Sequence, residues 1–428
     1  MSDSGISTAQ PAYLPTVLVW LAALVSACSS SPLDGSKTTH PSPIPGCETL
    51  DIVPCDALDP DCRTSRLELA ACLRQTQAGQ PPPVTVMTEQ QYVDHVNALY
   101  AARAPQGTNH FEAAMTWLGL AQPGSFGFTP LETENIAHWL GTYRWRDKDL
   151  LLIDHGKPAD DEASNVELVA ALIRALRDRD IDIAVWTTVV SVFDVDSNWG
   201  ADAMYFGEAR FFSNRYRASL AGLDPVHFDE FAQINDAIRE DVDWIRTQPS
   251  PYVATNSRFP HNFGARATYL AWQRNGLEGV NALYDDKLLT QQLMASETEA
   301  GKVPTLKYHA RPRAPEEWDQ DPTVTAVGAW GLFLSLSRTL EPDAAWSLAL
   351  DWSGEQLFVY KGIEPNQDDT ALVWQLETAD EASATALEEA LRGADPAARV
   401  ARTGSFVTLA KASNEDSLEW GFVDPSAQ

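Results

Sequence analysis

Apolar residues recur at helical spacing through much of the chain, most clearly in the segment that follows Ser164. Four of them fall at positions i, i+3, i+4 and i+7 and form one buried stripe: Val169, Leu172, Ile173 and Leu176. Ser164 and Glu167 stand three residues apart just before this stripe, which predicts a capping box at the start of the helix. Similar patterns predict helices over residues 65–74, 88–103, 111–120, 201–220 and 228–247.

Short continuous runs of apolar residues predict strands in two parts of the chain. Asp149–Asp154 encloses four aliphatic residues and predicts one buried strand ahead of the helix that follows Ser164. The last hundred residues predict helices over 326–340, 343–350 and 379–392, strands over 356–361 and 370–377, and one strand or a pair of strands over 400–410. We therefore expect an α+β fold, in which a mainly helical body with a short sheet is followed by a small α/β unit.

One apolar run near the start differs from all of these in its length and in the residues at its end. Val17–Ala27 would span about 16 Å as a helix, which is too short to cross a bilayer but fits the apolar core of a secretory signal. The run ends in Val25-Ser26-Ala27-Cys28, which resembles the lipobox of bacterial lipoproteins and implies a lipid on Cys28. Residues 1–16 contain no Lys or Arg, a departure from the usual basic start, and a plain cleaved signal is the alternative.

The remaining cysteines form a tight cluster that also indicates export. Four of them lie within 26 residues, and none occurs after residue 72: Cys47, Cys55, Cys62 and Cys72. An even cluster in an exported chain predicts two disulfides, for which three pairings are open. A zinc site is a weaker alternative here, because the cluster contains no C-x-x-C pair.

Composition divides the chain into four parts. Residues 1–28 form the lipoprotein-type signal, and residues 29–84 hold a Ser/Pro-rich tether and the cysteine cluster. Residues 85–320 form the helical body, and residues 321–428 form the C-terminal α/β unit. The whole chain carries a formal charge of −29, which disfavours nucleic acid and anionic membrane surfaces as partners. The expected contact with a membrane is through the lipid alone.

The segment from residue 136 to residue 183 reads IAHWLGTYRWRDKDLLLIDHGKPADDEASNVELVAALIRALRDRDIDI, with Gly141 and Tyr143 ahead of a strand and Ala175, Leu176, Asp178 and Asp182 in the following helix. This pattern resembles bacterial HExxH zinc metallopeptidase-like lipoproteins. In that family a G-x-Y element precedes the strand, and the helix motif H-E-x-x-H-A-L-x-D-x-x-x-D-L ends in the residues matched here. Later segments extend the resemblance across residues 85–410, with His261, Leu289 and Gln291 replacing expected residues. The resemblance implies that residues 85–320 form a zincin-like domain.

The residues that carry the chemistry of this family are absent. A zincin needs two histidines one helical turn apart, a glutamate that takes a proton from zinc-bound water, and a third ligand from the next helix. The matching positions are Ala170 and Arg174 for the histidines, Ala171 for the catalytic glutamate and Phe206 for the third ligand. The resemblance therefore implies a degenerate site without zinc, cofactor or peptidase activity. A buried Arg174 needs a carboxylate partner, and we expect Asp178, one turn further along, to provide it.

No other motif in the sequence restores a metal site. The eight histidines are all at least five residues apart, so no helical pair of histidine ligands exists. The segment from Asp194 to Asp202 has the D-x-D-x-N start of a calcium loop, but Trp199 and Tyr205 replace the glycine and glutamate that an EF-hand requires. We expect Asp194 to cap the following helix instead.

Three hypotheses about function arise from the sequence. The first is a pseudoenzyme that binds a protein or peptide partner along the former substrate cleft, anchored in the cell envelope. The second is an active hydrolase that uses carboxylates without zinc, for which Asp178, Asp182 and Glu208 are the candidates. The third is a purely structural envelope lipoprotein. The sequence favours a non-catalytic protein but does not separate the first hypothesis from the third.

Overall fold

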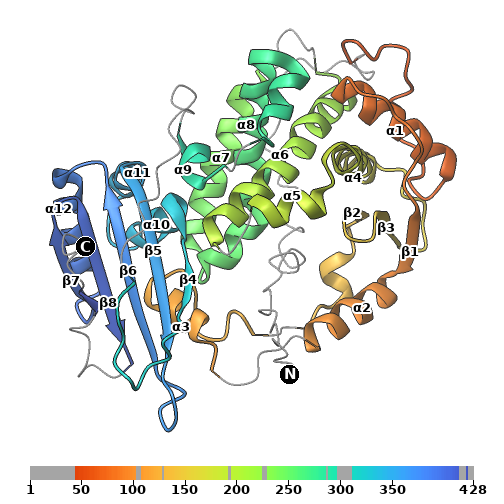
Figure 1. Ribbon diagram of the computed structural model, residues 1–428. Helices are drawn as coiled ribbons and strands as arrows, with labels where there is room; N and C mark the ends of the chain where they lie inside the picture. Colours follow the sequence, from red (N-terminus) through yellow and green to blue (C-terminus); the bar gives the residue numbers. More distant parts are fainter. Residues whose placement is uncertain are drawn as a thin grey trace, which may run out of the picture.

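A computed structural model of the chain has an α+β fold (Figure 1). Long helices fill the middle of the molecule, a three-stranded sheet lies on one side of them, and a five-stranded sheet lies on the other. The structure describes residues 44–102, 108–127, 130–190, 194–223, 229–285, 288–295, 311–413 and 421–422. Cys28 and most of the predicted tether lie outside the described residues.

The central helices pack closely because two of them meet at glycine. α6 and α8 contact each other extensively, α4 packs on α6, and α7 packs on α8. Where α6 and α8 cross, Gly207 and Gly264 lie so close that a Cβ added to Gly264 would stand 1.7 Å from the carbonyl oxygen of Ala203. The helices of this layer are α1 (Pro60–Arg74), α4 (Glu162–Ile181), α5 (Ile183–Val190), α6 (Val195–Leu220), α7 (Glu230–Thr247), α8 (Pro251–Ala282) and α9 (Thr290–Met294).

The three-stranded sheet separates two hydrophobic clusters. Its strands are β1 (Val84–Thr88), β2 (Gly141–Arg144) and β3 (Asp149–Asp154), in the order β1-β3-β2 with β1 parallel and β2 antiparallel to β3. Leu150 and Leu152 of β3 face the main core, whereas Leu151 and Ile153 face a smaller core beneath α2 (Glu89–Ala101) and η3 (Thr133–Ile136). Cover on both faces explains why the sequence of β3 is continuously apolar rather than alternating.

The five-stranded sheet is antiparallel and belongs mainly to the last hundred residues. Its order is β4-β5-β6-β8-β7, so the central strand β6 is buried along its whole length. The strands are β4 (Thr323–Thr325), β5 (Trp352–Lys361), β6 (Thr370–Thr378), β7 (Arg399–Thr403) and β8 (Phe406–Ala412). The helices that contact this sheet or each other are α3 (His110–Trp117), α10 (Gly328–Leu336), α11 (Pro342–Leu350) and α12 (Glu381–Ala394).

The main hydrophobic core runs through both the helical body and the C-terminal unit. Trp330 of α10 packs on Phe259 of α8, with 4.7 Å between the ring centroids. α3, which comes early in the sequence, contacts β5 and β6, and His110 Nδ1 lies 2.8 Å from Thr370 Oγ1. The boundary drawn near residue 320 therefore marks a change in the pattern of predicted elements along the chain. Residues on both sides of it contribute to the same hydrophobic core.

The cysteine segment is part of the folded body. Disulfides join Cys47 to Cys72 and Cys55 to Cys62, which selects one of the three pairings left open by the sequence. Residues on both sides of these bridges are buried in the main core: Ile44, Ala57, Leu67, Leu69 and Leu73. α1 packs on α4, where the Nε of Arg66 donates to the side chain of Asn165 at 3.0 Å. Residues 44–74, which composition groups with the tether, thus pack with the helices.

Most predicted elements occur in the structure, and one predicted cap is wrong. Thr88, the predicted start of a helix, is the N-cap of α2 and forms a capping box with Gln91, and the side chain of Asp194 caps α6 by accepting the amide of Ser197 at 2.5 Å. The capping box predicted at Ser164 does not form, because α4 begins one turn earlier at Glu162 with Asp161 as its N-cap. The amide of Ser164 donates to the Asp161 carboxylate at 2.9 Å.

Candidate functional site

The four positions that the resemblance aligns with the metal site lie on the adjacent helices α4 and α6. The guanidinium carbon of Arg174 stands 5.2 Å from the ring centroid of Phe206, so the structure brings these two side chains into contact. Ala170 is one turn before Arg174 and shares its helix face. Ala171 is only 1% exposed and lies in the main core. Arg174 and Phe206, which the resemblance aligns with two ligands, are therefore in direct contact.

Two further side chains belong to this place, although the sequence did not assign them to it. The ring of His261 on α8 lies 5.4 Å from the ring of Phe206, measured between centroids. Tyr205, which precedes Phe206 on α6, is 5% exposed and stands near enough to Arg174 for each to affect the pKa of the other. Burial, together with the nearby Arg210 and Arg174, lowers the pKa of His261 to about 3, so its imidazole is neutral at physiological pH. We call Ala170, Arg174, Tyr205, Phe206 and His261 the Arg174–Phe206 site.

The expected pairing of Arg174 with Asp178 is wrong. One carboxylate oxygen of Asp178 accepts the ammonium of Lys148 and the amide of Ile183, both at 2.8 Å, and the other accepts the Tyr143 hydroxyl at 2.6 Å. These partners come from the β2–β3 turn, β2 and the start of α5, and they occupy the carboxylate oxygens that a pairing with Arg174 would need. No hydrogen bond or ion pair joins Arg174 to any other residue in the part of the chain that the structure describes.

The residues of this site do not fit a zinc ion. Alanine and phenylalanine side chains offer no lone pair, and Arg174 keeps a fixed positive charge where a dication would bind. Within the described ranges, no three His, Cys, Asp or Glu side chains gather in an arrangement that could hold a metal. The carboxylates of the calcium-like segment accept backbone hydrogen bonds instead: Asp194 caps α6, and Asp196 accepts the amide of Thr290 at 2.9 Å.

The carboxylates proposed for a zinc-independent hydrolase are engaged in ion pairs. Lys148 bridges Asp178 and Asp182 with its Nζ at 2.8 and 3.0 Å from their oxygens. Glu208 is 1% exposed and accepts Nε of Arg74 at 2.8 Å, Nε of Arg177 at 2.7 Å and the Tyr284 hydroxyl at 2.7 Å. Burial alone would raise the pKa of Glu208, but the two arginines outweigh it and lower the pKa to about 2. These groups are placed to stabilise the fold.

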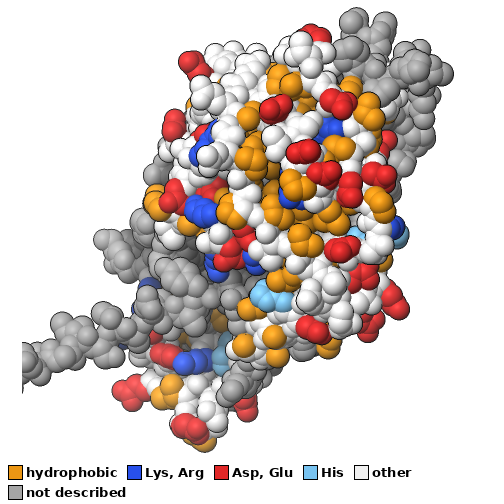
Figure 2. Space-filling model, turned by 90° about the vertical axis from the view of Figure 1, so that its right-hand side faces the viewer, with side chains coloured by type: hydrophobic (Ala, Val, Ile, Leu, Met, Phe, Trp, Pro, Cys, Tyr) orange, Lys and Arg blue, Asp and Glu red, His pale blue; other side chains and the backbone are white. Residues whose placement is uncertain are grey.

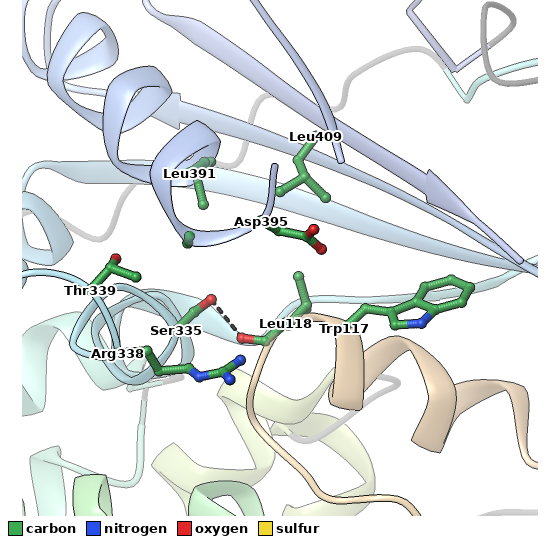
Figure 3. A pocket seen from close by; sticks show the side chains of 9 residues that line it. Trp117, Leu118, Ser335, Arg338, Thr339, Leu391, Asp395 and Leu409 are labelled. Atoms are coloured by element: carbon green, nitrogen blue, oxygen red, sulfur yellow. Dashed lines mark hydrogen bonds between the residues drawn. The ribbon is translucent and has the colours of Figure 1, made fainter. Parts of the chain in front are cut away.

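A small hollow lies where the ends of α3 and α10 meet α12 and β8 (Figure 3). Ser335 of α10 donates to the carbonyl of Leu118 at 2.7 Å on one side, and Asp395, which follows α12, lies on the other. The volume of about 100 Å³ is small beside the 300–1,000 Å³ typical of ligand pockets. A second hollow beside the Cys47–Cys72 disulfide is open to solvent. Neither hollow includes a residue of the Arg174–Phe206 site.

No protein-family model, no curated protein and no solved structure matches this chain. One face of the molecule carries acidic side chains spread among hydrophobic ones, with fewer basic ones, as expected for 60 acidic and 31 basic residues (Figure 2). Among the helices that the structure describes, none is both long and apolar enough to span a bilayer.

Proposed function

We propose that this protein is an exported, lipid-anchored protein of the cell envelope whose metallopeptidase-like scaffold binds a peptide or protein instead of cleaving it. The observation that carries the proposal is the contact between Arg174 and Phe206 at positions aligned with two metal ligands. A binding role without catalysis would explain why the positions aligned with metal ligands hold residues that cannot bind a metal, while the helices around them still pack together. The carboxylate hydrolase receives less support, because Asp178, Asp182 and Glu208 are all paired with cations.

The export part of the proposal is supported by the two disulfides. Disulfides persist in oxidising compartments and are rare in the cytosol, so the Cys47–Cys72 and Cys55–Cys62 bridges fit a non-cytoplasmic protein. The Val-Ser-Ala-Cys sequence that ends at Cys28 supports a lipid anchor as the means of retention in the envelope.

Replacing Cys28 with alanine should release the protein from membranes. The native chain is expected to incorporate a labelled fatty acid and to fractionate with membranes, because acylation of Cys28 would be its attachment. The Cys28→Ala variant should carry no label. Replacing Ser30 with alanine, two residues further along, is the matched control and should change neither result. Equal solubility of the native chain and the Cys28→Ala variant, with no label on either, would refute the anchor.

The purified protein is expected to contain no stoichiometric zinc and to show no chelator-sensitive peptidase activity. A catalytic zinc needs three protein ligands and a position for water, and Ala170, Arg174 and Phe206 supply none of the three. Elemental analysis and a peptide hydrolysis assay with and without chelator measure both properties. One tightly bound zinc per chain in the native protein would contradict the proposal.

A restored variant provides the converse test of the same prediction. It combines Ala170→His, Ala171→Glu, Arg174→His and Phe206→Glu, and we expect it to bind one zinc per chain if the helices retain the geometry of a metal site. The matched control carries the same substitutions except that Arg174 is kept, and its guanidinium should prevent zinc binding. Zinc uptake by both variants alike would show that the metal binds elsewhere.

A further inference from the structure

Among the residues that the structure describes, none forms a hydrogen bond or ion pair with the buried guanidinium of Arg174. Its side chain is only 9% exposed, and its Nε is shut off from solvent without a hydrogen-bond acceptor. Within the described part of the chain, the guanidinium stacks on the ring face of Phe206. An aromatic face attracts a cation, but it does not replace an acceptor for the in-plane N–H groups of the guanidinium. A buried guanidinium without hydrogen-bond acceptors destabilises a fold, so this arrangement favours an acceptor supplied from outside the part of the chain that the structure describes.

A second unsatisfied donor lies against the same aromatic ring: the ring centroid of Tyr205 is 5.2 Å from that of Phe206, which Arg174 also contacts. The hydroxyl of Tyr205 is buried and has no hydrogen-bond partner in the described structure. Burial raises the pKa of this phenol well above its usual value although Arg174 opposes the rise, so the group is a neutral O–H donor. A guanidinium from α4 and a hydroxyl from α6 therefore lie against the same ring, and the described residues provide an acceptor for neither.

We propose that Arg174 and Tyr205 together bind one carboxylate group of a peptide ligand, an inference that rests on the proposed peptide-binding function. A carboxylate has two oxygens and several lone pairs, so it can accept the guanidinium N–H groups and the phenol at once. Phe206 and Ala170 supply an apolar surface beside the carboxylate for the rest of the ligand. Both of them, and also His261, keep partial exposure to solvent, which gives the ligand access.

The charges around the site favour one carboxylate over a phosphate or another ligand of higher charge. Burial raises the pKa of Glu167 to about 7, and Arg174 is one of the groups that oppose this rise, so Glu167 lies within electrostatic reach of the site. Asp202, one turn before Phe206 on α6, also has its pKa raised to about 7 by burial. These two acidic groups, on a protein of net charge −29, would repel a dianion more strongly than a single carboxylate.

The test uses N-acetyl-alanyl-alanine with a free carboxylate, and its C-terminal amide, as probes. Binding is followed through the NMR resonances of the arginine Nε–H groups in the whole folded protein. The free acid should shift the Arg174 resonance saturably, while the Arg177 resonance, already paired with Glu208, stays in place. The amide should bind at least about tenfold more weakly, as expected when a hydrogen bond to a charged group is lost.

Variants separate a binding role of Arg174 from a structural one. Tyr205→Phe should weaken binding of the free acid about tenfold while Arg174 remains in place. Arg174→Met should abolish binding and yet raise the thermal midpoint of the free protein, because it removes a buried unpaired charge. Arg338→Gln, at an exposed arginine beside the small hollow, is the control and should change neither property.

Several results would overturn this inference. An Arg174 resonance that does not move up to the solubility limit of the free acid would do so, as would equal affinity for the acid and the amide. If chloride shifted the Arg174 resonance as much as the free acid does, the effect would be a non-specific response to anions, and the proposed carboxylate site would be rejected. Binding of the probe that is independent of Arg174 would leave the proposed function standing and remove only this inference. Cleavage of the probe, followed on the same samples, would instead refute the proposed function and this inference with it.

Discussion

Replacing Glu208 with glutamine is expected to destabilise the protein by about 3–5 kcal/mol. Glu208 is the counter-charge of two buried arginines, since Arg74 and Arg177 are both essentially inaccessible to solvent. A neutral amide would leave their guanidinium groups buried without enough acceptors. Among the described residues, Arg74 would keep its contact with the partly exposed Asp180, at 3.0 Å, as its one remaining ion pair.

Urea unfolding at neutral pH measures this loss, and its pH dependence identifies the cause. Because the folded-state pKa of Glu208 is lowered to about 2, its contribution is fully present above its ordinary pKa near 4.5 and is lost as the pH falls from there towards 2. The Glu208→Gln variant should lack this part of the acid sensitivity. Asp236→Asn, which breaks an exposed pair with Arg239, should leave stability unchanged. A Glu208→Gln variant as stable as the native protein would show that the buried cluster does not stabilise the fold.

Replacing Gly264 with alanine is expected to cost about 3 kcal/mol of folding stability, an unusually large effect for one methyl group. The added Cβ would stand 1.7 Å from the carbonyl oxygen of Ala203 and 2.9 Å from the Cα of Gly207. Both are backbone atoms, so no side-chain rotation relieves the clash and α6 and α8 must separate. Gly264→Ser and Gly264→Val should reduce folding stability further, in order of side-chain size.

Gly393→Ala is the matched control for this substitution. Gly393 also lies within a helix, α12, but a Cβ added there meets no atom within 4 Å. That variant should gain about 0.5–1 kcal/mol, because alanine loses less conformational entropy in a helix than glycine does. Equal effects of the two substitutions would mean that helix propensity, and not the close approach of α6 and α8, decides the outcome. Chemical unfolding of both variants distinguishes these results.

Local sequence patterns predicted the elements well, because the information that specifies them is local. The helix start at Thr88, the cap at Asp194 and the continuous apolar run of β3 each depend on a few neighbouring residues, and each occurs in the structure. The cap at Ser164 failed for a reason that is also local. Asp161, three residues earlier, competes for the same role, and it begins α4 a turn sooner while Glu167 accepts the backbone amide of Leu140 at 2.8 Å.

Partners that are distant in the sequence could not be predicted in the same way. Arg174 and Asp178 have ideal spacing for a helical ion pair, but Lys148 and Tyr143 approach Asp178 from the small sheet. The sequence indicates Glu208 only as a candidate catalytic carboxylate, because nothing in it shows that Arg74 and Arg177 converge on this residue. The pairing of the four cysteines likewise depends on the fold of the whole segment.

The candidate site was predicted in part. The resemblance selected Arg174 and Phe206 by position in two motifs, and the structure places them in contact. Tyr205 and His261 were missed as members of the site. A usable signal was present for Tyr205, since it directly precedes an aligned ligand position, and for His261, since it replaces a tyrosine in a segment aligned with the family.

The disulfide-bonded segment at the start of the described chain also has a mechanical consequence. A pull on the chain ahead of Ile44 reaches Cys47 within four residues and passes through the covalent bridge to Cys72, near the end of α1. Arg74, two residues further, carries the load into α6 through Glu208. Tension applied at this end is therefore distributed along α1, which packs on α4. The segment should resist being pulled off the helical body one residue at a time, starting from Ile44.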